Sequence, residues 1–140
     1  MEIKINIVTT DLDYKDCLYI RNKVFIEEQN INRQLEYDDK KVDAIYILAK
    51  INLIAIGTAR YPSTEIGMKL ERFAVLKKYR GLGVGKSLVS FLLKTLKAEK
   101  NLYLNSQKKV AGFYKKLGFK VKGDVFYEAK IPHYKMVLSG

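Results

Sequence analysis

Several residue types that extracellular and metal-binding proteins use are scarce in this sequence. It has one cysteine, Cys17, one histidine, His133, two prolines and no tryptophan. A single cysteine excludes an intrachain disulfide and suits a reducing compartment, so we expect a cytoplasmic protein. Because structural and catalytic zinc sites draw on clusters of cysteine and histidine, we expect no metal site.

Long apolar segments and long basic runs are lacking as well. No segment approaches the ~18 consecutive apolar residues of a membrane-spanning helix, and the amino-terminal residues do not form a secretion signal, so we expect no membrane partner. The net charge is nevertheless +11, which would attract nucleic acid, anionic lipid or a phosphorylated ligand. Because the lysines occur singly or in pairs, we expect a solvated basic surface and no nucleic-acid partner.

Length and composition predict one globular domain over residues 1–140. The chain is 48% hydrophobic and 29% charged, which is an ordinary composition for a folded protein with a single core. Hydrophobic residues recur every second position in some segments and every third or fourth in others, as strands and helices require. The expected strands cover residues 2–8, 42–50, 53–61, 67–76, 102–104, 119–121 and 134–138.

The expected helices lie between these strands. The first follows the N-cap residue Thr10 and reaches Glu28, the second follows a glycine-rich turn after Arg80, and the third ends at Gly118. This order of elements predicts a mixed α/β sandwich, because a sheet must cover the apolar faces of the three helices.

The segment from Arg80 to Ser87 has the richest chemistry in the sequence. Its three glycines, at positions 81, 83 and 85, let the backbone adopt conformations closed to other residues and bring N–H groups close to a ligand. Because the turn opens a helix, these N–H groups and the helix dipole together form a site for an anion such as a diphosphate. Neither a Walker loop nor a dinucleotide fingerprint fits the glycine spacing.

The pattern Arg-x-x-Gly-x-Gly from Arg80 to Gly85, preceded by the strand 70–76, resembles the coenzyme A pyrophosphate loop of the GNAT superfamily of acyltransferases. Together with further segments it resembles the small bacterial YjcF-like or ElaA-like branch, over residues 21–136. These segments are Arg21-x-x-Val24-Phe25-Ile26-x-Glu28-Gln29, Ile56 to Arg60, Leu104 to Gln107, Phe113-Tyr114-x-x-Leu117-Gly118-Phe119 and Ile131-Pro132-His133. The resemblance implies the GNAT fold, a mixed and mostly antiparallel sheet of six to seven strands flanked by three to four helices.

The resemblance also implies that acetyl-CoA is the acyl donor. In such enzymes the sheet splays beside the strand before the glycine loop, so that backbone groups of this strand align the pantetheine arm. The loop backbone would hold the pyrophosphate. The residues expected to contact the coenzyme are Phe73, Ala74, Val75, Arg80, Gly81, Leu82, Gly83, Val84, Gly85, Lys86, Ser87, Asn105, Gln107, Phe113 and Tyr114.

Amide formation needs a neutral amine, stabilisation of the oxyanion and a proton for the leaving thiolate. By resemblance Tyr114 would supply that proton, since a phenol with an ordinary pKa of ~10 is protonated at neutral pH. A plain buried tyrosine is the alternative. Glu71 would be the base, directly or through water, unless it is exposed or merely pairs with Arg72. Glu28 is the reserve candidate.

The residues expected to line the acceptor cleft are Arg21, Phe25, Glu28, Arg60, Arg72 and His133. Arginines there would favour an acceptor that bears a carboxylate or phosphate. His133 could move protons, but acceptor binding or a structural role is the favoured interpretation. We therefore expect an N-acetyltransferase, monomeric or homodimeric, that acts on the primary amine of a small molecule. A protein amine as acceptor, and a non-catalytic acyl-CoA-binding module, are the alternatives.

Overall fold

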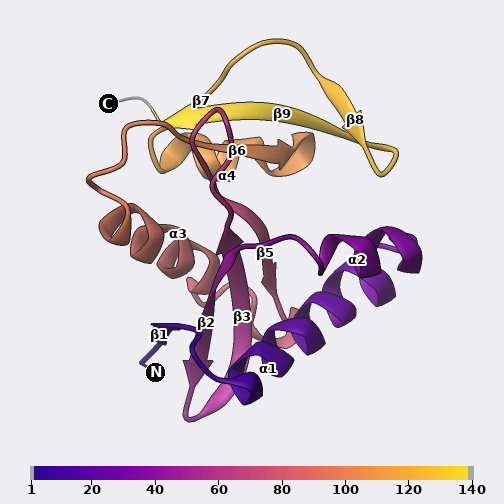
Figure 1. Cartoon of the computed structure of the whole chain (residues 1–140), viewed down its shortest axis with the longest axis vertical. Coiled ribbons are helices and arrows are strands. Elements are labelled where there is room, and N and C mark those ends of the chain that lie inside the picture. The colour runs from indigo at the N-terminus through magenta and orange to yellow at the C-terminus, as the bar shows by residue number, and fades with distance from the viewer. Residues whose placement is uncertain (1, 139–140) are drawn as a thin grey trace.

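Two β-sheets form the framework in the computed structural model, which describes residues 2–138 (Figure 1). The first sheet has the strand order β1-β2-β3-β5, and the second has the order β4-β6-β9-β7, with β8 paired to β9. All strand pairs are antiparallel except β4 with β6. The strands within these residues are β1 Lys4–Ile7, β2 Ile45–Ile51, β3 Ile54–Tyr61, β4 Met68–Lys69, β5 Glu71–Val75, β6 Leu102–Gln107, β7 Phe119–Val121, β8 Phe126–Glu128 and β9 Ile131–Leu138.

Helices connect and cover these sheets. The Thr10 side chain caps the first helix by accepting a hydrogen bond from the Asp13 backbone at 3.2 Å. Within residues 2–138 no helix has both the length and the apolar character that crossing a membrane requires. The helices are α1 Asp11–Arg21, the π-helical η1 Asn22–Glu28, α2 Arg33–Asp39, the short η2 Lys77–Tyr79, α3 Val84–Thr95, the short η3 Lys108–Val110 and α4 Ala111–Lys116.

The first sheet is buried on both faces, because α1 and α3 cover opposite sides of it (Figure 1). Strand β2 shows this alternation: Ile47 and Ala49 belong to the core that α3 closes, whereas Leu48 faces the cluster around α1. Cys17 is fully buried in the α1 cluster, and burial raises the pKa of its thiol to about 11. This cysteine is therefore a packed thiol and not a nucleophile.

The two sheets separate at Leu70, between β4 and β5. Strand β4 pairs with β6, and the Leu70 N–H still donates to the Tyr103 carbonyl at 2.8 Å. From Glu71 onward the chain pairs with β3 in the other sheet, so the β6-facing edge of β5 has no strand beside it within the described residues. The splay expected from the resemblance is thus present.

The predicted mixed α/β architecture is confirmed, with three corrections. The sheet is divided into two, and the described residues form nine strands, because the expected strand 67–76 is split and β8 was not predicted. The first helix continues to Glu28 as predicted, but it changes from α- to π-helical hydrogen bonding at Asn22. Helix α2 was also missed, since its seven residues are too few for a clear hydrophobic period.

Candidate active site

A cleft of about 1060 Å³ lies where β5 and β6 diverge. Its walls come from β5, the glycine turn, the end of β6, α4, η1 and the start of β9. The splayed strands thus bring together segments that are far apart in the sequence. Of the residues singled out by sequence, the cleft is lined by Phe25, Glu28, Glu71, Arg72, Phe73, Ala74, Val75, Arg80, Gly81, Gly83, Val84, Gly85, Lys86, Asn105, Gln107, Phe113, Tyr114 and His133.

The glycine turn at one end of the cleft forms an open backbone cradle. Gly81 and Gly83 have φ values of 82° and 86°, and a Cβ atom added at either position would meet no atom within 4 Å. The first hydrogen bond into α3 runs from the Ser87 N–H to the Gly83 carbonyl at 3.0 Å. Within the described chain, no acceptor pairs with the backbone N–H groups of residues 81–86. These donors, together with the amino-terminal end of α3, fit a diphosphate.

Arg80 at the start of this turn is held by two other elements. Its Nε donates to the Val75 carbonyl at 3.0 Å, and its two terminal nitrogens donate to both carboxylate oxygens of Glu28 at 2.8 and 2.6 Å. The hydrogen bond from Arg80 lowers the pKa of Glu28 despite some desolvation. The pair therefore links the end of η1 to the anion cradle, and Glu28 is ionised at neutral pH.

Tyr114 lies on α4 with its ring packed among aromatic side chains. The ring centroids of Phe73, Phe113 and Phe119 are 5.8, 5.0 and 6.2 Å away. Tyr114 is only 8% exposed, and burial raises the pKa of its phenol above the ordinary value. Burial alone causes this shift, with no hydrogen bond to the hydroxyl group among residues 2–138, so a protonated phenol is held beside the cleft.

Glu71 lies at the first position of β5, on the wall of the cleft, and is surrounded by cations. Its carboxylate accepts from Arg60 Nε at 2.6 Å and contacts Lys69 Nζ at 3.1 Å and Arg72 Nη1 at 3.9 Å. Burial by itself would raise the pKa of Glu71, but the charges of Arg72, Arg60 and Lys69 outweigh it and lower the pKa. Glu71 is therefore a buried residue of the cleft wall whose close partner is Arg60, with Arg72 farther away, and its role as the base stays a prediction.

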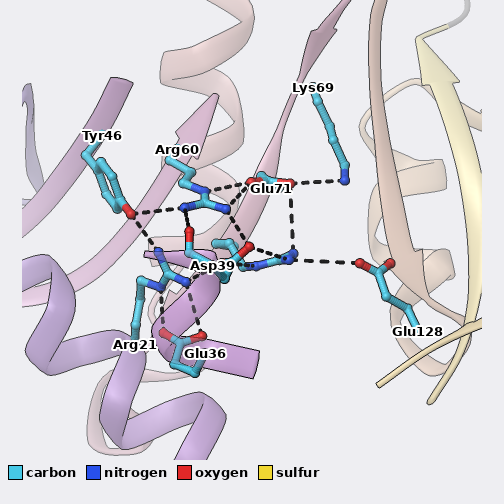
Figure 2. Close-up of polar contacts among 9 residues, drawn as sticks. Arg21, Glu36, Asp39, Tyr46, Arg60, Lys69, Glu71 and Glu128 are labelled. Carbon is cyan, nitrogen blue, oxygen red and sulfur yellow. Dashed lines mark hydrogen bonds and ion pairs between the residues drawn. The ribbon is translucent and has the colours of Figure 1, made fainter. Parts of the chain in front are cut away.

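Arg21 and Arg60 are not cleft residues, which corrects the expectation that they line the acceptor site. Both side chains are 0% exposed, and the Tyr46 hydroxyl accepts from Arg21 at 2.6 Å and from Arg60 at 3.2 Å (Figure 2). Their guanidinium groups form ion pairs with carboxylates of α2 and β5. Neither arginine is therefore free to hold an acceptor. The ion-paired cluster consists of Arg21, Glu36, Asp39, Arg60, Lys69, Glu71, Arg72 and Glu128.

His133 lies near the start of β9 and is oriented by two contacts. Its Nδ1 is 2.7 Å from the Ile131 carbonyl, and its ring stacks on Phe126 with centroids 5.8 Å apart. Because a carbonyl can only accept, Nδ1 carries the hydrogen, and Nε2 is the lone-pair nitrogen of the neutral ring. Gln107 is the partner of His133 on the neighbouring strand β6, and it donates to the Gln29 side chain at 3.1 Å.

Two predicted coenzyme residues, Leu82 and Ser87, belong to the turn and to α3 but lie outside the cleft lining. Sequence reasoning also missed cleft residues and partners of cleft residues. Lys108 and Lys109 line the cleft after β6, and a pair of lysines gave no signal of its own. Asp39 was not predicted as a functional residue, because its helix α2 was not predicted. The local signal that could have indicated this helix is Asn32, whose side chain caps α2.

The donor set of the cleft suits an organic anion better than a metal ion. Within residues 2–138, no group of three or more His, Cys, Asp or Glu side chains is arranged to hold a metal. The cleft instead offers backbone N–H groups, arginine and lysine, which are the usual partners of phosphate oxygens.

Comparison with known proteins gives consistent matches along the chain. Residues 10–139 match the family described as acetyltransferase (GNAT) domain. YyaT of Bacillus subtilis is 38% identical over 135 residues, which are 92% of this chain and 90% of YyaT. YjcF of the same organism is 32% identical over 138 residues, 96% of this chain and 99% of YjcF. The crystal structure of Escherichia coli ElaA superposes with a TM-score of 0.84 at 27% identity, covering 99% of this chain and 100% of ElaA.

Proposed function

The chain belongs to the GNAT acetyltransferase family, and from that premise we propose that it transfers the acetyl group of acetyl-CoA to the primary amine of a small molecule. The whole chain acts as one transferase domain, in the cytoplasm. The predicted kinship with YjcF and ElaA is confirmed by their similarity over nearly the full chain. The acyl donor, the acceptor and the residue roles are the proposal.

One observation carries it: the cleft joins an anion cradle, a free strand edge and a buried phenol. The cradle at Gly81 and Gly83 supports binding of the pyrophosphate of coenzyme A. The β6-facing edge of β5 supports main-chain pairing with the pantetheine arm at residues 73–75. Tyr114 lies along the same cleft, where a thiol leaving group would be released.

Two side chains handle protons in this proposal. The bound thioester supplies an activated acetyl group to the site. Glu71, kept ionised by its lowered pKa, accepts the amine proton directly or through a water molecule. Tyr114, whose raised pKa keeps it protonated, donates its hydrogen to the leaving sulfur. Glu28 is the reserve base, because it lies at the end of η1 and is held by Arg80 of the glycine turn, whereas Glu71 lies on β5, the strand of residues 73–75.

The acceptor enters the part of the cleft lined by Arg72, Phe25 and His133. Of the three arginines expected to line the acceptor cleft, Arg72 is the one that lines it, with a partly exposed side chain. A protein amine is the nearer alternative acceptor. A module that binds acyl-CoA without catalysis is the other alternative, and it is favoured by the engagement of both glutamates with arginines.

The test has two stages that separate binding from chemistry. Calorimetry of the pure protein with coenzyme A and with acetyl-CoA should show saturable binding of both. A panel of small primary amines with acetyl-CoA, read by release of free thiol, should then identify acceptors. Binding without thiol release for any amine would favour the binding module, and absence of binding would overturn the proposal.

A further inference from the structure

Asp39, at the end of α2, is the point where three arginines from three elements meet. Its Oδ1 lies 2.8 Å from Nη2 of Arg60 on β3, and its Oδ2 lies 2.8 Å from Nε of Arg72 on β5. Its Oδ2 also pairs with Arg21 of α1, and its backbone carbonyl accepts from Arg60 Nη1 at 2.8 Å. Figure 2 shows Asp39 between Arg21, Arg60 and the side chains of β5. A single carboxylate therefore ties α1, β3 and β5 to α2.

The backbone of β5 is irregular at the residue that Asp39 holds. Thr58 of β3 faces Ala74, but Arg60 faces Glu71, so β5 carries one residue more than β3 over this stretch. Arg72 lies in that stretch and has a φ of 55°, a left-handed conformation that is unfavourable for any residue with a Cβ atom. Such conformations persist only where surrounding contacts determine them, and they concentrate at functional sites. Two hydrogen bonds from Arg72 to Asp39, at 2.8 and 3.1 Å, provide such contacts.

Glu71 is bound to the same assembly through the arginines that Asp39 anchors. Arg60 bridges the two acids, since its Nη2 contacts Asp39 Oδ1 at 2.8 Å and Glu71 Oε2 at 2.5 Å. Arg72 follows Glu71 directly in the sequence, so the conformation of Arg72 sets the direction in which the Glu71 side chain leaves the strand. Asp39 itself does not line the cleft.

We propose that Asp39 is a positioning residue of the acceptor site: by holding Arg60 and Arg72 together, it fixes the irregular segment of β5 and so orients the Glu71 carboxylate toward the cleft. This inference rests on the proposed function of the cleft, because it assigns Asp39 a role through a proposed base. It also gives α2 a function, as the element that carries Asp39 to β5.

The charges around Glu71 set the sign of the effect expected when Asp39 is changed. Glu71 faces Arg60 from β3, Lys69 from β4 and Arg72 from β5. Arg72 is shared with Asp39 of α2 and Glu128 of β8, and Arg60 with Tyr46 of β2 and Asp39. Replacing Asp39 by asparagine removes a negative charge and leaves those arginines to Glu71, so the midpoint at which Glu71 titrates should fall. A substitution that merely loosened the structure would expose Glu71 to solvent and return this midpoint toward its ordinary value.

The experiment compares Asp39→Asn with two variants of the same helix. Asp38→Asn makes the same chemical change at the neighbouring exposed acid, whose side chain accepts a hydrogen bond from Gln34. Glu36→Gln alters a buried acid of the ion cluster whose carboxylate, within residues 2–138, pairs with Arg21 and not with Arg60 or Arg72. The measurements are titration of the Glu71 carboxyl by ¹³C NMR, calorimetry with coenzyme A, and kcat/KM with acetyl-CoA and the most active amine of the screen.

Asp39→Asn should lower the Glu71 midpoint and reduce kcat/KM by about 100-fold, the effect of a misplaced catalytic group, while coenzyme A affinity stays at the wild-type level. Asp38→Asn and Glu36→Gln should leave the Glu71 midpoint and kcat/KM near wild type. An unmoved or raised midpoint in Asp39→Asn, or an equal loss of kcat/KM in Glu36→Gln, would overturn the inference.

Failure of this inference can be distinguished from failure of the proposed function. If the wild type does not bind coenzyme A or finds no amine, the proposed function fails, and the Glu71 titration still decides whether Asp39 controls that carboxylate. If Asp39→Asn does not fold, Arg72→Gln breaks the same link from the partly exposed side. Arg72→Gln should raise the Glu71 midpoint and reduce kcat/KM by a similar factor. A Glu71 midpoint or a kcat/KM equal to the wild-type value would contradict the inference.

Discussion

The hydroxyl group of Tyr114 is the one feature of that side chain that packing does not explain, because the aromatic contacts would suit phenylalanine equally well. Tyr114→Phe should therefore preserve the fold and coenzyme A affinity but lower kcat by about 100-fold, as loss of a general acid does. Stopped assays of thiol release at saturating acetyl-CoA measure the change. Tyr127→Phe, on an exposed part of β8, is the matched control, and equal rates in both variants would reduce Tyr114 to a packing residue.

The carboxylate of Asp39 makes a second prediction at the residue scale, this time for stability. Burial would raise its pKa, but Arg72, Arg60 and Arg21 outweigh burial and lower the pKa from 3.8 to about 2. A lowered folded-state pKa means that the contribution to stability is complete above pH ~4 and is lost as the pH falls toward 2, by about 2 kcal/mol in total.

Urea unfolding of the wild type between pH 7 and pH 2 should therefore show a loss of unfolding free energy concentrated below pH 4. Glu71 adds a contribution of the same sign, because its pKa is lowered too. Asp39→Asn should be less stable at pH 7 and should lose less between pH 4 and pH 2 than the wild type. Parallel curves for the two proteins would show that Asp39 is not held in the ionised form by its arginines.

At the scale of elements, the turn between β5 and α3 depends on glycine for its backbone conformation and for its open cradle. Gly83→Ala should lower the unfolding free energy by about 1–2 kcal/mol, because a Cβ atom is strained at a φ of 86°. It should also weaken coenzyme A binding, since the added methyl group points into space that is otherwise open.

Gly112→Ala is the control for this change. Gly112 lies within α4, has no atom within 4 Å of an added Cβ and does not have a positive φ. Alanine there should raise the unfolding free energy by about 0.5–1 kcal/mol and leave coenzyme A binding unchanged. If Gly83→Ala bound coenzyme A as the wild type does, the turn would not be the diphosphate site.

The link between η1 and the glycine turn leads to a prediction about donor affinity. The Glu28 carboxylate pairs with Arg80, whose guanidinium group would otherwise be free to bind a phosphate. Glu28→Gln should tighten coenzyme A binding by less than ~1 kcal/mol, at most about fivefold, because the pair is partly exposed. Glu27→Gln removes a charge from the same element, where Glu27 pairs with the exposed Lys23, and should change affinity less. Weaker binding in Glu28→Gln would instead show that Glu28 holds Arg80 in the binding position.

The sequence predicted those elements that are determined by the local spacing of residues, and it did not predict those that depend on distant contacts. The turn at residues 80–87 was predicted because alternate glycines directly before a helix are typical of a backbone anion site, and its cradle is present. The burial of Arg21 and Arg60 could not be predicted, because their partner Asp39 belongs to a helix too short to show a period. The irregular backbone at Arg72 left no trace either, since an arginine in a strand gives no sign of a positive φ.

At the scale of the whole molecule, the cleft exists because one continuous segment belongs to two sheets. Residues 68–70 are tied to β6, and residues 71–75 are tied to β3, so the sheets must part between β5 and β6. Helices α1 and α3 pack on the two faces of the first sheet and are part of the same framework (Figure 1). The site is therefore built into the framework, and we expect the free protein to hold the cleft open.

The net charge of +11 should attract a polyanionic donor to the cleft, and this attraction should depend on the salt concentration. Raising the ionic strength from 0.01 to 0.15 M shortens the screening distance from about 30 to about 8 Å. Distant lysines should then stop contributing, while those at the cleft still do. Coenzyme A affinity and association rate should both fall over this range, as measured by calorimetry and stopped-flow fluorescence.

Two double variants of equal charge separate the local contribution from the global one. Lys108→Gln with Lys109→Gln removes two charges from the cleft wall, and Lys115→Gln with Lys116→Gln removes two exposed charges from α4 outside it. At low salt both pairs should weaken binding, since each lowers the field of the whole molecule. At 0.15 M salt only the Lys108 and Lys109 pair should still do so. Equal losses at high salt would mean that the basic surface attracts the donor as a whole and that the wall after β6 does not contact it.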